Sequence, residues 1–417
     1  MEIRDPLYGL IKYDPVEEQI INSAPFQRLR GIKQLALASL VYPGAHHTRF
    51  EHCIGAMHLA GQVASKLNLK DKDKRTVRLA GLLHDLGHGP FSHVSEQIME
   101  PYAAKLMNKH RAEGAHELMS ILLIQKHPDL CKILKPCERE SIVELLQKQD
   151  KRSLEKDVIS GPLDVDKLDY LRRDSYFAGV QYGVFDTYKV IESLTKIEIG
   201  SSGTTLGIDE EGVYAVEQLL LAKYHMNAQV YCHRIRRISD AMLVRGIRCT
   251  LEEGVSDLQK YFAVDDTSKF AEKYVECDDN LVMDMISKYS KGTAREYLRR
   301  ICERRLLKEA FCIAINRTNF ANGMLVQKAL NITEAQRKRL EKEAAKIFSD
   351  RSAVIDPRLV IVDKHGLSNP TFKSPKIRID SSTIMVQSGK GARNSFPEVS
   401  SVFSNPAVGL HKEGDRV

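Results

Sequence analysis

Apolar residues recur at three- and four-residue steps along most of the chain, which is the spacing of helices that bury one face. Thr48 to Glu51 has the form of a capping box, so we expect Thr48 to be the N-cap of a helix and Glu51 to lie at position N3. Val77 to Leu86 predicts a second apolar helix, ended by Gly87, Gly89 and Pro90. Behind Thr48, the apolar positions of the first helix are Cys53, Ala56, Met57, Ala60, Val63, Ala64 and Leu67.

Weaker versions of the same spacing predict helices near residues 112–127, 138–149, 164–178 and 213–250, and again across 257–348. Residues 1–15 contain a short apolar run between two turn signals. Two further apolar runs, 196–199 and 204–208, lie on either side of a Gly-Ser-Ser-Gly turn at 200–203. Each of these patterns predicts a β-hairpin. Short strands are expected at 358–362 and 376–379. The fold class is therefore mainly α, with small β additions at the start, in the middle and near the end.

These patterns divide the chain into four regions. We expect a catalytic region over 1–250, with a metal-binding core at about 48–178, and a helical C-terminal region over 251–348. A short β element follows at 349–380. Residues 381–417 are rich in Ser, Gly, Asn and Pro, which predicts a partly disordered tail.

Composition narrows the class of protein. The chain has 417 residues, of which 43% are apolar, and no stretch approaches the ~20 apolar residues of a membrane span. Three of its first five residues are charged and no apolar core follows the start, so we expect no signal peptide. The eight cysteines contain no C-x-x-C pair, which indicates reduced thiols in a cytoplasmic protein without a membrane partner. A net charge of +7 is compatible with anionic ligands and does not by itself indicate nucleic acid.

The densest chemical signal is His84, Asp85, His88 and His93, which lie within ten residues at the end of the second apolar helix. Imidazole and carboxylate ligands together suit Zn, Mn or Fe. His84 and Asp85 are ~100° apart on a helix, so both can approach one ion, and His88 follows one turn later. A single histidine here is more readily explained as a cap or surface group. The whole cluster is not, because dense buried charge is costly without a metal or an anion.

Other candidate ligands lie elsewhere in the sequence. His52 is in the first turn of the capped helix. Asp166, Tyr170 and Asp174 share one helix face at four-residue steps, and the acidic Asp164 is best explained as compensation of the helix dipole. His46 and His47 are expected in a loop and receive no role.

His52, then His84-Asp85, then Asp166 resembles the H…HD…D motif of the HD-domain metal-dependent phosphohydrolases. Longer segments resemble the dNTP triphosphohydrolase branch of this family, which includes a human enzyme with an added sterile-alpha-motif domain that is not expected here. The resemblance is detailed over residues 2–250 and weaker over 251–380. The segments that carry it are 26–35, 42–45, 49–52, 80–93 and 164–170.

The resemblance implies an HD-domain helical bundle with one divalent transition metal (Mn, Fe or Zn), together with Mg on the substrate phosphates. It implies cleavage of a dNTP at the α-phosphorus to give deoxynucleoside and inorganic triphosphate. Each implied role falls on a matching residue: metal binding on His52, His84, Asp85 and Asp166; catalysis on His88, His93, Glu96 and His116; phosphate binding on Arg49, Lys167 and Lys223; sugar and base binding on Gln34, Leu35, Tyr170, Asp174 and Tyr231.

Three positions depart from the branch. Lys223 replaces an arginine, so bidentate phosphate binding is lost, and Glu96 replaces an aspartate. Asn22 replaces the aspartate of a guanine-binding regulatory site of which Gln27 and Arg30 are retained, so we do not expect the same guanine control. The expected partners are the dNTP, further copies of the chain as a dimer or tetramer, and weakly bound single-stranded nucleic acid. An HD-type phosphohydrolase acting on another nucleotide, a phosphodiester or single-stranded DNA, and a non-catalytic nucleotide-binding scaffold, remain the alternatives.

Overall fold

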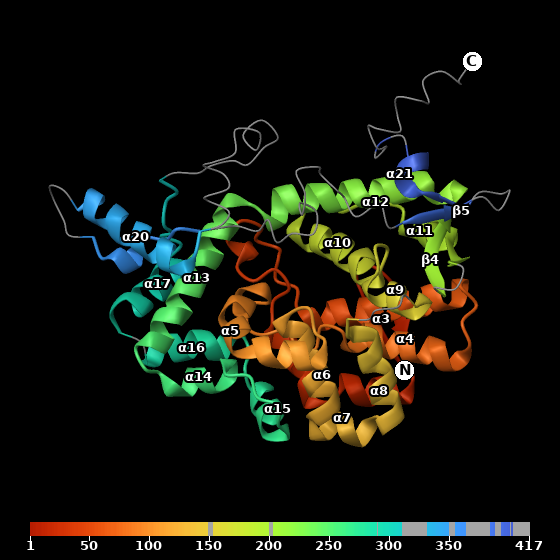
Figure 1. Ribbon diagram of the computed structural model, residues 1–417, viewed down its shortest axis with the longest axis horizontal. Helices are drawn as coiled ribbons and strands as arrows, with labels where there is room; N and C mark the ends of the chain where they lie inside the picture. The colour runs from red at the N-terminus through yellow and green to blue at the C-terminus, as the bar shows by residue number, and fades with distance from the viewer. Residues whose placement is uncertain are drawn as a thin grey trace, which may run out of the picture. The chain divides into compact units, whose positions relative to one another are not determined.

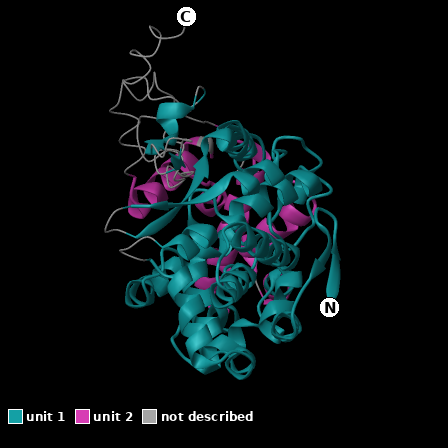
Figure 2. Cartoon of the chain, turned by 90° about the vertical axis from the view of Figure 1, so that its right-hand side faces the viewer, with its two compact units in different colours: residues 1–233, 256–284, 381–417 teal, residues 234–255, 285–380 magenta. Residues whose placement is uncertain are grey.

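The computed structural model describes residues 1–148, 153–199, 203–289, 291–310, 332–349, 355–363, 384–387, 393–400 and 402. The chain forms two compact units, which Figure 2 shows in different colours. The first comprises residues 1–233, 256–284 and 381–417, and the second comprises residues 234–255 and 285–380. None of the helices in the described parts is long and apolar enough to cross a bilayer.

The first unit is mainly helical, as predicted, and Figure 1 labels most of its helices. Its elements are β1 (Glu2–Asp5), β2 (Gly9–Lys12), α1 (Pro15–Ile21), α2 (Ala24–Gln27), α3 (Arg49–Lys66), α4 (Asp71–Leu83), α5 (His93–His110), α6 (Ala115–Lys126), α7 (Pro128–Ile133), α8 (Pro136–Leu146), α9 (Leu154–Ser160), α10 (Val165–Ala178), α11 (Thr187–Ser193), β3 (Leu194–Glu198), β4 (Thr204–Asp209), α12 (Val213–Met226), α14 (Ser256–Phe262), α15 (Ser268–Tyr274), β5 (Met385–Gln387), β6 (Arg393–Ser395) and α21 (Phe396–Val399). Helix α16 (Asp279–Tyr289) begins in the first unit and ends in the second.

Helix α3 is the centre of this unit and packs against α4 and α10. The predicted capping box is present, with Thr48 as N-cap and Glu51 at N3. The predicted apolar positions from Cys53 to Leu67 are all buried. Gly55 faces α10, where a Cβ would collide with the side chains of Asp169 and Arg173. Helix α3, which is buried along most of its length and lies close to α10 at Gly55, therefore supports the site described below.

Several predicted boundaries differ from the structure. Helix α4 ends at Leu83 and not at Leu86, because the following turn packs so closely on α6 that a Cβ at Gly87 would collide with the backbone of His116 and Ser120. The helix predicted over 213–250 is divided into α12, a π-helix (Asn227–Tyr231) and α13 (Arg234–Glu252). Helix α5 was not predicted.

Two small sheets accompany the helices. Strands β1 and β2 form the predicted N-terminal hairpin, and β3 pairs with β4 in the predicted central hairpin. Strand β5 pairs in parallel with β4 and antiparallel with β6, and α21 lies beside them near α11 and α12 in Figure 1. The prediction of a disordered tail from 381 is therefore wrong for 384–387 and 393–400, where Ile384, Val386 and Phe396 are buried. The remainder of that tail lies outside the described residues.

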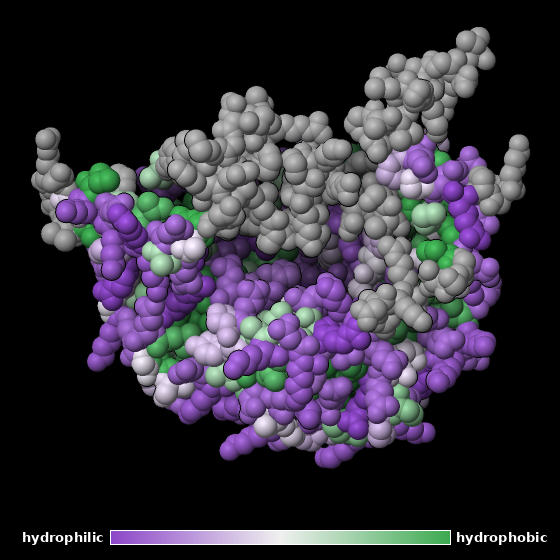
Figure 3. All heavy atoms as spheres, viewed as in Figure 1, coloured by the Kyte–Doolittle hydropathy of each residue, from purple (hydrophilic) through white to green (hydrophobic). Residues whose placement is uncertain are grey.

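The face of the first unit over α6, α7 and α8 is largely polar (Figure 3). Figure 3 shows hydrophilic side chains over α6, α7 and α8, with apolar side chains singly or in small groups between them. The apolar residues of these helices are mostly buried, including Leu122 and Ile142. Apolar side chains of these helices thus lie mainly inside the unit and polar ones at this face.

The second unit contains α13, α17 (Gly292–Cys302), α20 (Glu334–Phe348) and a 3-10 helix (Pro357–Leu359). The helical character predicted for 257–348 is confirmed for α14, α15, α16, α17 and α20, whereas the described residues 303–310 are not helical. The strand predicted at 358–362 is wrong, because the Asp356 carboxylate accepts the Arg358 backbone N–H and Pro357 opens a helical turn. The strand predicted at 376–379 lies outside the described residues.

Candidate metal and phosphate site

The four predicted metal ligands converge in the first unit. His52 lies in the first turn of α3, His84 and Asp85 follow α4, and Asp166 is in the first turn of α10. His52 Nε2 is 3.3 Å from His84 Nε2, 3.4 Å from Asp85 Oδ2 and 3.1 Å from Asp166 Oδ1. His84 Nε2 is 3.5 Å from one oxygen of each carboxylate. Ligand atoms that each lie about 2.0–2.2 Å from one ion are about 3–3.5 Å apart, so the four side chains fit a single transition metal.

The other nitrogen of each histidine is already engaged. His52 Nδ1 is 2.8 Å from an oxygen of Asp169, and His84 Nδ1 is 2.8 Å from the carbonyl oxygen of Gly81. Because both partners are acceptors, each Nδ1 carries a proton, and each Nε2 is the nitrogen that faces the centre, where a metal can take the place of a second proton. The two imidazoles are therefore oriented as metal ligands by the fold itself.

Asp169 is part of a buried chain of charges that reaches the N-terminal hairpin. Arg173 donates to both oxygens of Asp169, at 2.8 and 2.9 Å, and to Asp5 at 2.9 Å. Burial alone would lower the pKa of His52, but its hydrogen bonds to Asp166 and Asp169 raise that pKa to about 10. The surrounding carboxylates thus favour a cation at this point.

Arg49, a predicted phosphate ligand, lies at the edge of the four ligands. Its guanidinium contacts the carboxylate of Asp85, and its Nε donates to Ser92 Oγ at 2.9 Å. Burial opposes ionisation of Asp85, but the Arg49 charge holds the pKa of that carboxyl well below its ordinary value. Ser92 in turn donates to the carbonyl oxygen of Lys33 at 2.7 Å, so the orientation of the guanidinium is set by the loop before α5.

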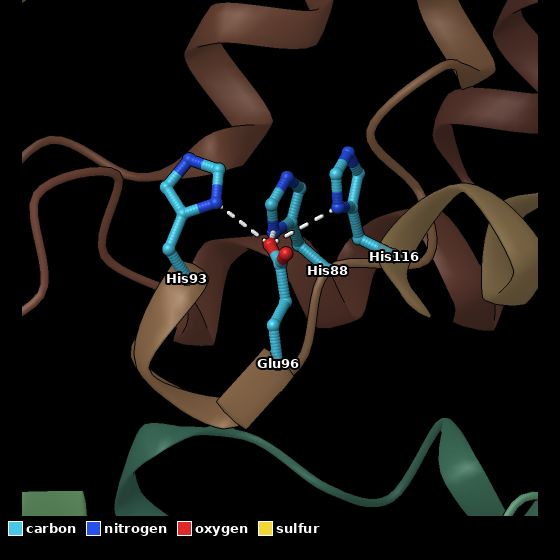
Figure 4. A group of neighbouring side chains, drawn as sticks. All are labelled: His88, His93, Glu96 and His116. Carbon is cyan, nitrogen blue, oxygen red and sulfur yellow. Dashed lines mark hydrogen bonds and ion pairs between the residues drawn. The ribbon is translucent and has the colours of Figure 1, made fainter. Parts of the chain in front are cut away.

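The four predicted catalytic residues form a second cluster, shown in Figure 4. Glu96 Oε1 is 2.7 Å from His93 Nδ1, 3.0 Å from His116 Nδ1 and 3.6 Å from His88 Nδ1. The rings of His88 and His116 are stacked with centroids 4.2 Å apart. On its opposite side, His88 Nε2 is 3.3 Å from Asp85 Oδ1. His88 therefore lies between the second cluster and the metal ligands.

The pKa values of the two stacked rings, His116 and His88, are shifted in opposite directions. Burial lowers the pKa of His116, but the charge and hydrogen bond of Glu96 raise it to about 9. Burial, together with the charges of Arg49 and His116, lowers the pKa of His88 well below its ordinary value. At neutral pH the cluster thus holds a protonated His116 beside a neutral His88.

The loop between α4 and α5 is held from two sides. Ser120 of α6 donates to the His84 carbonyl at 2.7 Å and accepts the Gly87 N–H at 2.8 Å. On the other side, the carboxylate of Asp279 accepts the backbone N–H groups of Phe91 at 2.6 Å and Lys33 at 3.1 Å. Residues far apart in the sequence therefore determine where Ser92, and through it Arg49, is placed.

The segment before α16 also contacts this loop, directly and through Arg28. Arg28 donates to the carbonyl oxygens of Cys277 at 2.8 Å and His88 at 2.7 Å, and its guanidinium lies over the Tyr274 ring, 4.4 Å from the centroid. The Tyr274 hydroxyl donates to the Gly87 carbonyl at 2.9 Å. Residues 274–279 thus form one side of the loop that carries His88.

The residues predicted to bind the sugar and base lie further along α10. Asp174 receives hydrogen bonds from the Tyr231 hydroxyl at 2.8 Å and from His47 Nε2 at 2.7 Å. The rings of Tyr170 and Tyr231 are 6.1 Å apart. Gln34 and Leu35 are buried.

The two predicted lysines differ from Arg49. The Lys167 ammonium contacts Asp164 and the Gly161 carbonyl, and Asp164 is the N-cap of α10, a position that agrees with the predicted compensation of the helix dipole. In this arrangement Lys167 is directed at its own helix start. Lys223 is half-buried in α12, two turns before Tyr231.

The three predicted regulatory residues lie close together. Asn22 is the exposed C-cap residue of α1. Gln27 donates to the Ile21 carbonyl at 2.7 Å and accepts from Arg30 Nε at 3.0 Å. The Arg30 guanidinium lies 3.5 Å from the centre of the Phe50 ring. A role for these residues stays a prediction.

Sequence reasoning missed four residues of this region: His47, Ser92, Asp169 and Asp279. Asp169 could have been found from its four-residue spacing to Arg173, which is typical of a helical ion pair. His47 could have been found from its position two residues before Arg49 on an extended segment. Nothing local indicates Asp279, because both of its partners lie almost 190 or more residues away.

Comparison with known proteins agrees with this geometry. The HD domain matches residues 49–174, and the HD associated region matches residues 185–390. An uncharacterized protein of Methanocaldococcus jannaschii is 35% identical over 286 residues, which is 69% of this chain and 57% of that protein. The human deoxynucleoside triphosphate triphosphohydrolase SAMHD1 is 30% identical over 346 residues, covering 73% of this chain and 54% of the human one.

The chain thus spans about half the length of these relatives. The crystal structure of a phosphohydrolase from Bacteroides thetaiotaomicron has the same fold, with a TM-score of 0.69, 23% identity and coverage of 97% of this chain and 95% of that one. Its similarity concerns the fold alone. With two family regions matched in sequence and the H…HD…D side chains gathered at one point, this chain belongs to the HD-domain family, in which it joins an HD domain to an HD-associated region.

Proposed function

We propose that this protein is a metal-dependent phosphohydrolase that cleaves dNTPs at the α-phosphorus into deoxynucleoside and inorganic triphosphate. The observation that carries the proposal is the convergence of His52, His84, Asp85 and Asp166, with both histidine Nε2 atoms facing the two carboxylates. Similarity to a human enzyme named as a dNTP triphosphohydrolase supports the substrate class.

The donor set fits a divalent transition metal. Two imidazoles and two carboxylates suit Mn, Fe or Zn, and the spacing of their donor atoms agrees with one ion. When bound, such a metal would supply Lewis-acid polarisation of a phosphate oxygen and a lowered pKa for water. The identity of the metal stays open to measurement.

Among the described residues, Arg49 is a buried cation placed at the edge of the four candidate ligands, where it can contact the substrate phosphates. Two of its N–H groups are used by Ser92 and Asp85, so its plane is fixed while other donors remain for a phosphate oxygen. Such a contact is charge-assisted and pre-oriented, which favours binding of an anionic ester over a neutral one.

The histidine and glutamate cluster supplies the proton that the leaving oxygen needs. His116 keeps a proton at neutral pH through its ion pair with Glu96, and His93 shares the same carboxylate oxygen. His88 stays neutral and connects this cluster to Asp85. Proton donation by such a positioned group typically contributes about 10²–10⁴-fold to a rate.

Product analysis tests the proposal. The purified chain is incubated with a panel of dNTPs and NTPs in the presence of Mn, Fe, Zn or Mg, and the nucleoside and phosphate products are separated by chromatography. Deoxynucleoside and triphosphate in equal amounts are the expected products, and His84→Ala protein is the control for contaminating phosphatases. Release of orthophosphate or of a nucleoside monophosphate would instead favour an HD phosphohydrolase of another specificity. Absence of turnover with every metal would favour the nucleotide-binding scaffold.

The expectations of a homo-oligomer, of weak single-stranded nucleic acid binding and of a cytoplasmic location also belong to this proposal. Light scattering of the purified chain tests the first. A titration with fluorescent single-stranded DNA at two salt concentrations tests the second, because phosphate contacts weaken as salt rises.

A further inference from the structure

The turn of the N-terminal hairpin is tied to α10 by one side chain. Asp5 ends strand β1, and its Oδ1 accepts the backbone N–H groups of Leu7 at 2.8 Å and Tyr8 at 3.1 Å. Its Oδ2 accepts from Nη1 of Arg173 at 2.9 Å. One oxygen of Asp5 therefore shapes the turn, and the other connects the turn to the helix that carries Asp166.

This connection lies in the interior of the first unit. Arg173 and Asp169 have no exposed surface, and Asp5 is 6% exposed. The Arg173 guanidinium lies 5.8 Å from the centroid of the Tyr8 ring, and α3 approaches so closely that a Cβ at Gly55 would collide with the side chains of Asp169 and Arg173. Charges that are excluded from water in this way act on one another more strongly than charges at a surface.

Arg173 divides its hydrogen bonds between two carboxylates. Its Nε and Nη2 donate to Asp169 at 2.8 and 2.9 Å, while Nη1 donates to Asp5. The oxygen that accepts from Nε, Asp169 Oδ2, also accepts from His52 Nδ1 at 2.8 Å. Arg173 and His52 thus share one acceptor atom. A guanidinium that is held more tightly by Asp169 therefore makes this oxygen a weaker acceptor for the imidazole.

We propose that Asp5 is a positioning residue for the candidate metal ligand His52. Because Asp5 takes up part of the Arg173 charge, Asp169 Oδ2 keeps the negative charge that orients the His52 ring and strengthens Nε2 as a ligand. The N-terminal hairpin then contributes to metal affinity without supplying a ligand. This inference rests on the metal-binding part of the proposed function and extends it to the first strand of the chain.

A second buried ion pair of the N-terminal segment provides a matched control. Arg78 of α4 donates to both oxygens of Glu17 at 2.7 Å and to the carbonyl oxygen of Lys12, the last residue of β2, at 3.3 Å. Glu17 is 1% exposed, so it is at least as buried as Asp5. Glu17→Gln therefore removes a buried charge beside the same hairpin, but from a pair that includes neither Arg173 nor Asp169.

The first measurement compares metal affinity in Asp5→Asn and Glu17→Gln. In Asp5→Asn the amide oxygen can still accept from the turn, while the N–H₂ group faces the donors of Arg173. Titration of metal-free protein with Zn²⁺ against a chromogenic chelator should give a Kd about three- to tenfold higher for Asp5→Asn than for wild-type protein, less than the roughly 10–100-fold effect of a direct partner of a ligand. The Kd of Glu17→Gln should equal that of wild-type protein.

Denaturant melts of the same preparations compare the loss of stability in the two variants. Asp5→Ser carries the same expectation and replaces Asp5→Asn if that variant does not fold. Its hydroxyl oxygen can accept from the turn but offers no charge to Arg173.

The second measurement needs neither metal nor turnover. In metal-free protein labelled with ¹⁵N-histidine, the Nδ1–H resonance of His52 is assigned by its loss in His52→Gln. Asp5→Asn should shift this proton upfield and make it exchange faster with water, because its hydrogen bond to Asp169 is weaker. Glu17→Gln should leave the resonance unchanged, even where it costs as much stability as Asp5→Asn.

Two results would overturn the inference. One is an unchanged Zn²⁺ Kd or an unchanged His52 resonance in Asp5→Asn, since Asp5 would then only stabilise the turn. The other is equal weakening of metal binding in Asp5→Asn and Glu17→Gln, since the loss of any buried charge near the hairpin would then be sufficient. If wild-type protein binds Zn²⁺ but hydrolyses no dNTP with any metal, the proposed reaction fails, and the two measurements still decide this inference. Wild-type protein that binds no Zn²⁺ would contradict the metal site and this inference with it.

Discussion

At the scale of single residues, the site is organised by which ring nitrogen each histidine commits to the fold. His52 and His84 both use Nδ1 toward protein acceptors, a carboxylate in one case and a backbone carbonyl in the other. The carboxylate of Asp169 orients the His52 ring, and its negative charge also increases the basicity of that ring. Removal of a ligand and removal of its orienting partner should therefore have different effects.

We expect His84→Ala to lose metal at any workable concentration, because the three remaining ligands lack both the charge balance and the geometry of the site. Asp169→Asn should keep all four ligands but bind metal roughly 10–100-fold more weakly, since the orientation and basicity of His52 change. It also weakens the buried ion pair with Arg173, so the stability of the variant is measured alongside its metal affinity. Metal content by mass spectrometry after dialysis, with circular dichroism as the check of folding, measures both. Equal affinity in Asp169→Asn and wild-type protein would contradict the role of the carboxylate.

The His116–Glu96 pair predicts a dependence on pH. The pKa of His116 is raised from 6.5 to about 9, because Glu96 outweighs the effect of burial. Its contribution to stability is therefore fully present below pH 6.5 and is lost as the pH rises through 9. The difference in unfolding free energy between metal-free wild-type and His116→Gln protein should shrink from pH 6 to pH 9.5. Denaturant melts at several pH values measure it, and a difference that stays constant over this range would count against the pair.

At the scale of elements, the loop between α4 and α5 carries most of the candidate chemistry but little internal structure. Phe91 and Ser92 have positive φ angles of 58° and 55°, which non-glycine residues adopt only when the surroundings hold them. The surroundings here are Ser120 of α6 and Asp279 at the start of α16. An HD-domain loop is thus held in place by a residue outside the region that matches the HD domain.

Asp279→Asn should lower kcat/KM without removing the metal. The amide supplies one acceptor oxygen in place of two, so one of the backbone N–H groups of Phe91 and Lys33 is left unpaired, and Ser92 and Arg49 lose their fixed position. We expect the free energy of unfolding to fall by about 1–3 kcal/mol. Kinetics, metal content and denaturant melts of the same preparation provide the test.

The matched control is Glu276→Gln, an exposed residue of the same segment that pairs with Lys273 at the surface. It should change neither stability nor kcat/KM measurably, because exposed pairs contribute little. If Asp279→Asn behaves like this control, the loop is held by Ser120 and Arg28 alone.

At the scale of the whole molecule, the N-terminal segment is linked to the candidate metal site, and its residue 22 departs from what the resemblance implies. The hairpin reaches His52 through Asp5, Arg173 and Asp169. Asn22, at the end of α1, stands where the resemblance places a guanine-reading aspartate. An amide offers one acceptor oxygen and one N–H₂ group, so it cannot give N1–H and N2–H₂ of guanine an oxygen each, as a charged carboxylate does.

Guanine nucleotides should therefore not be obligatory activators. The missing charge-assisted part of the contact is of the order of 1–3 kcal/mol, or about ten- to a hundredfold in affinity. Hydrolysis of dATP with and without GTP, alongside light scattering, measures activation and assembly together. Strict dependence on GTP, with larger assemblies only in its presence, would show that Asn22 does not decide this property.

Local sequence patterns determined the helical class, the capped helix α3 and both hairpins, because side-chain periodicity and turn residues act over a few neighbouring positions. They also indicated the four metal-ligand candidates and the dipole role of Asp164, since these depend on residue type and spacing along a helix. The strand expected at 358–362 was predicted from a short apolar run alone. The two residues before this run, Asp356 and Pro357, begin a 3-10 helix instead.

Only the tertiary structure decided which nitrogen of each histidine faces the centre, because the deciding partners, Asp169 and the Gly81 carbonyl, come from packing and not from order in the chain. It also showed that Asp279 supports the loop of Phe91 and that His47 meets Asp174, 127 residues away. The sequence pattern places residues 385–387 in a tail, whereas the structure pairs them with β4 as strand β5 and buries Val386. In each case a long-range contact outweighs a weak or ambiguous local preference, since burial and hydrogen bonding across the fold set the final arrangement.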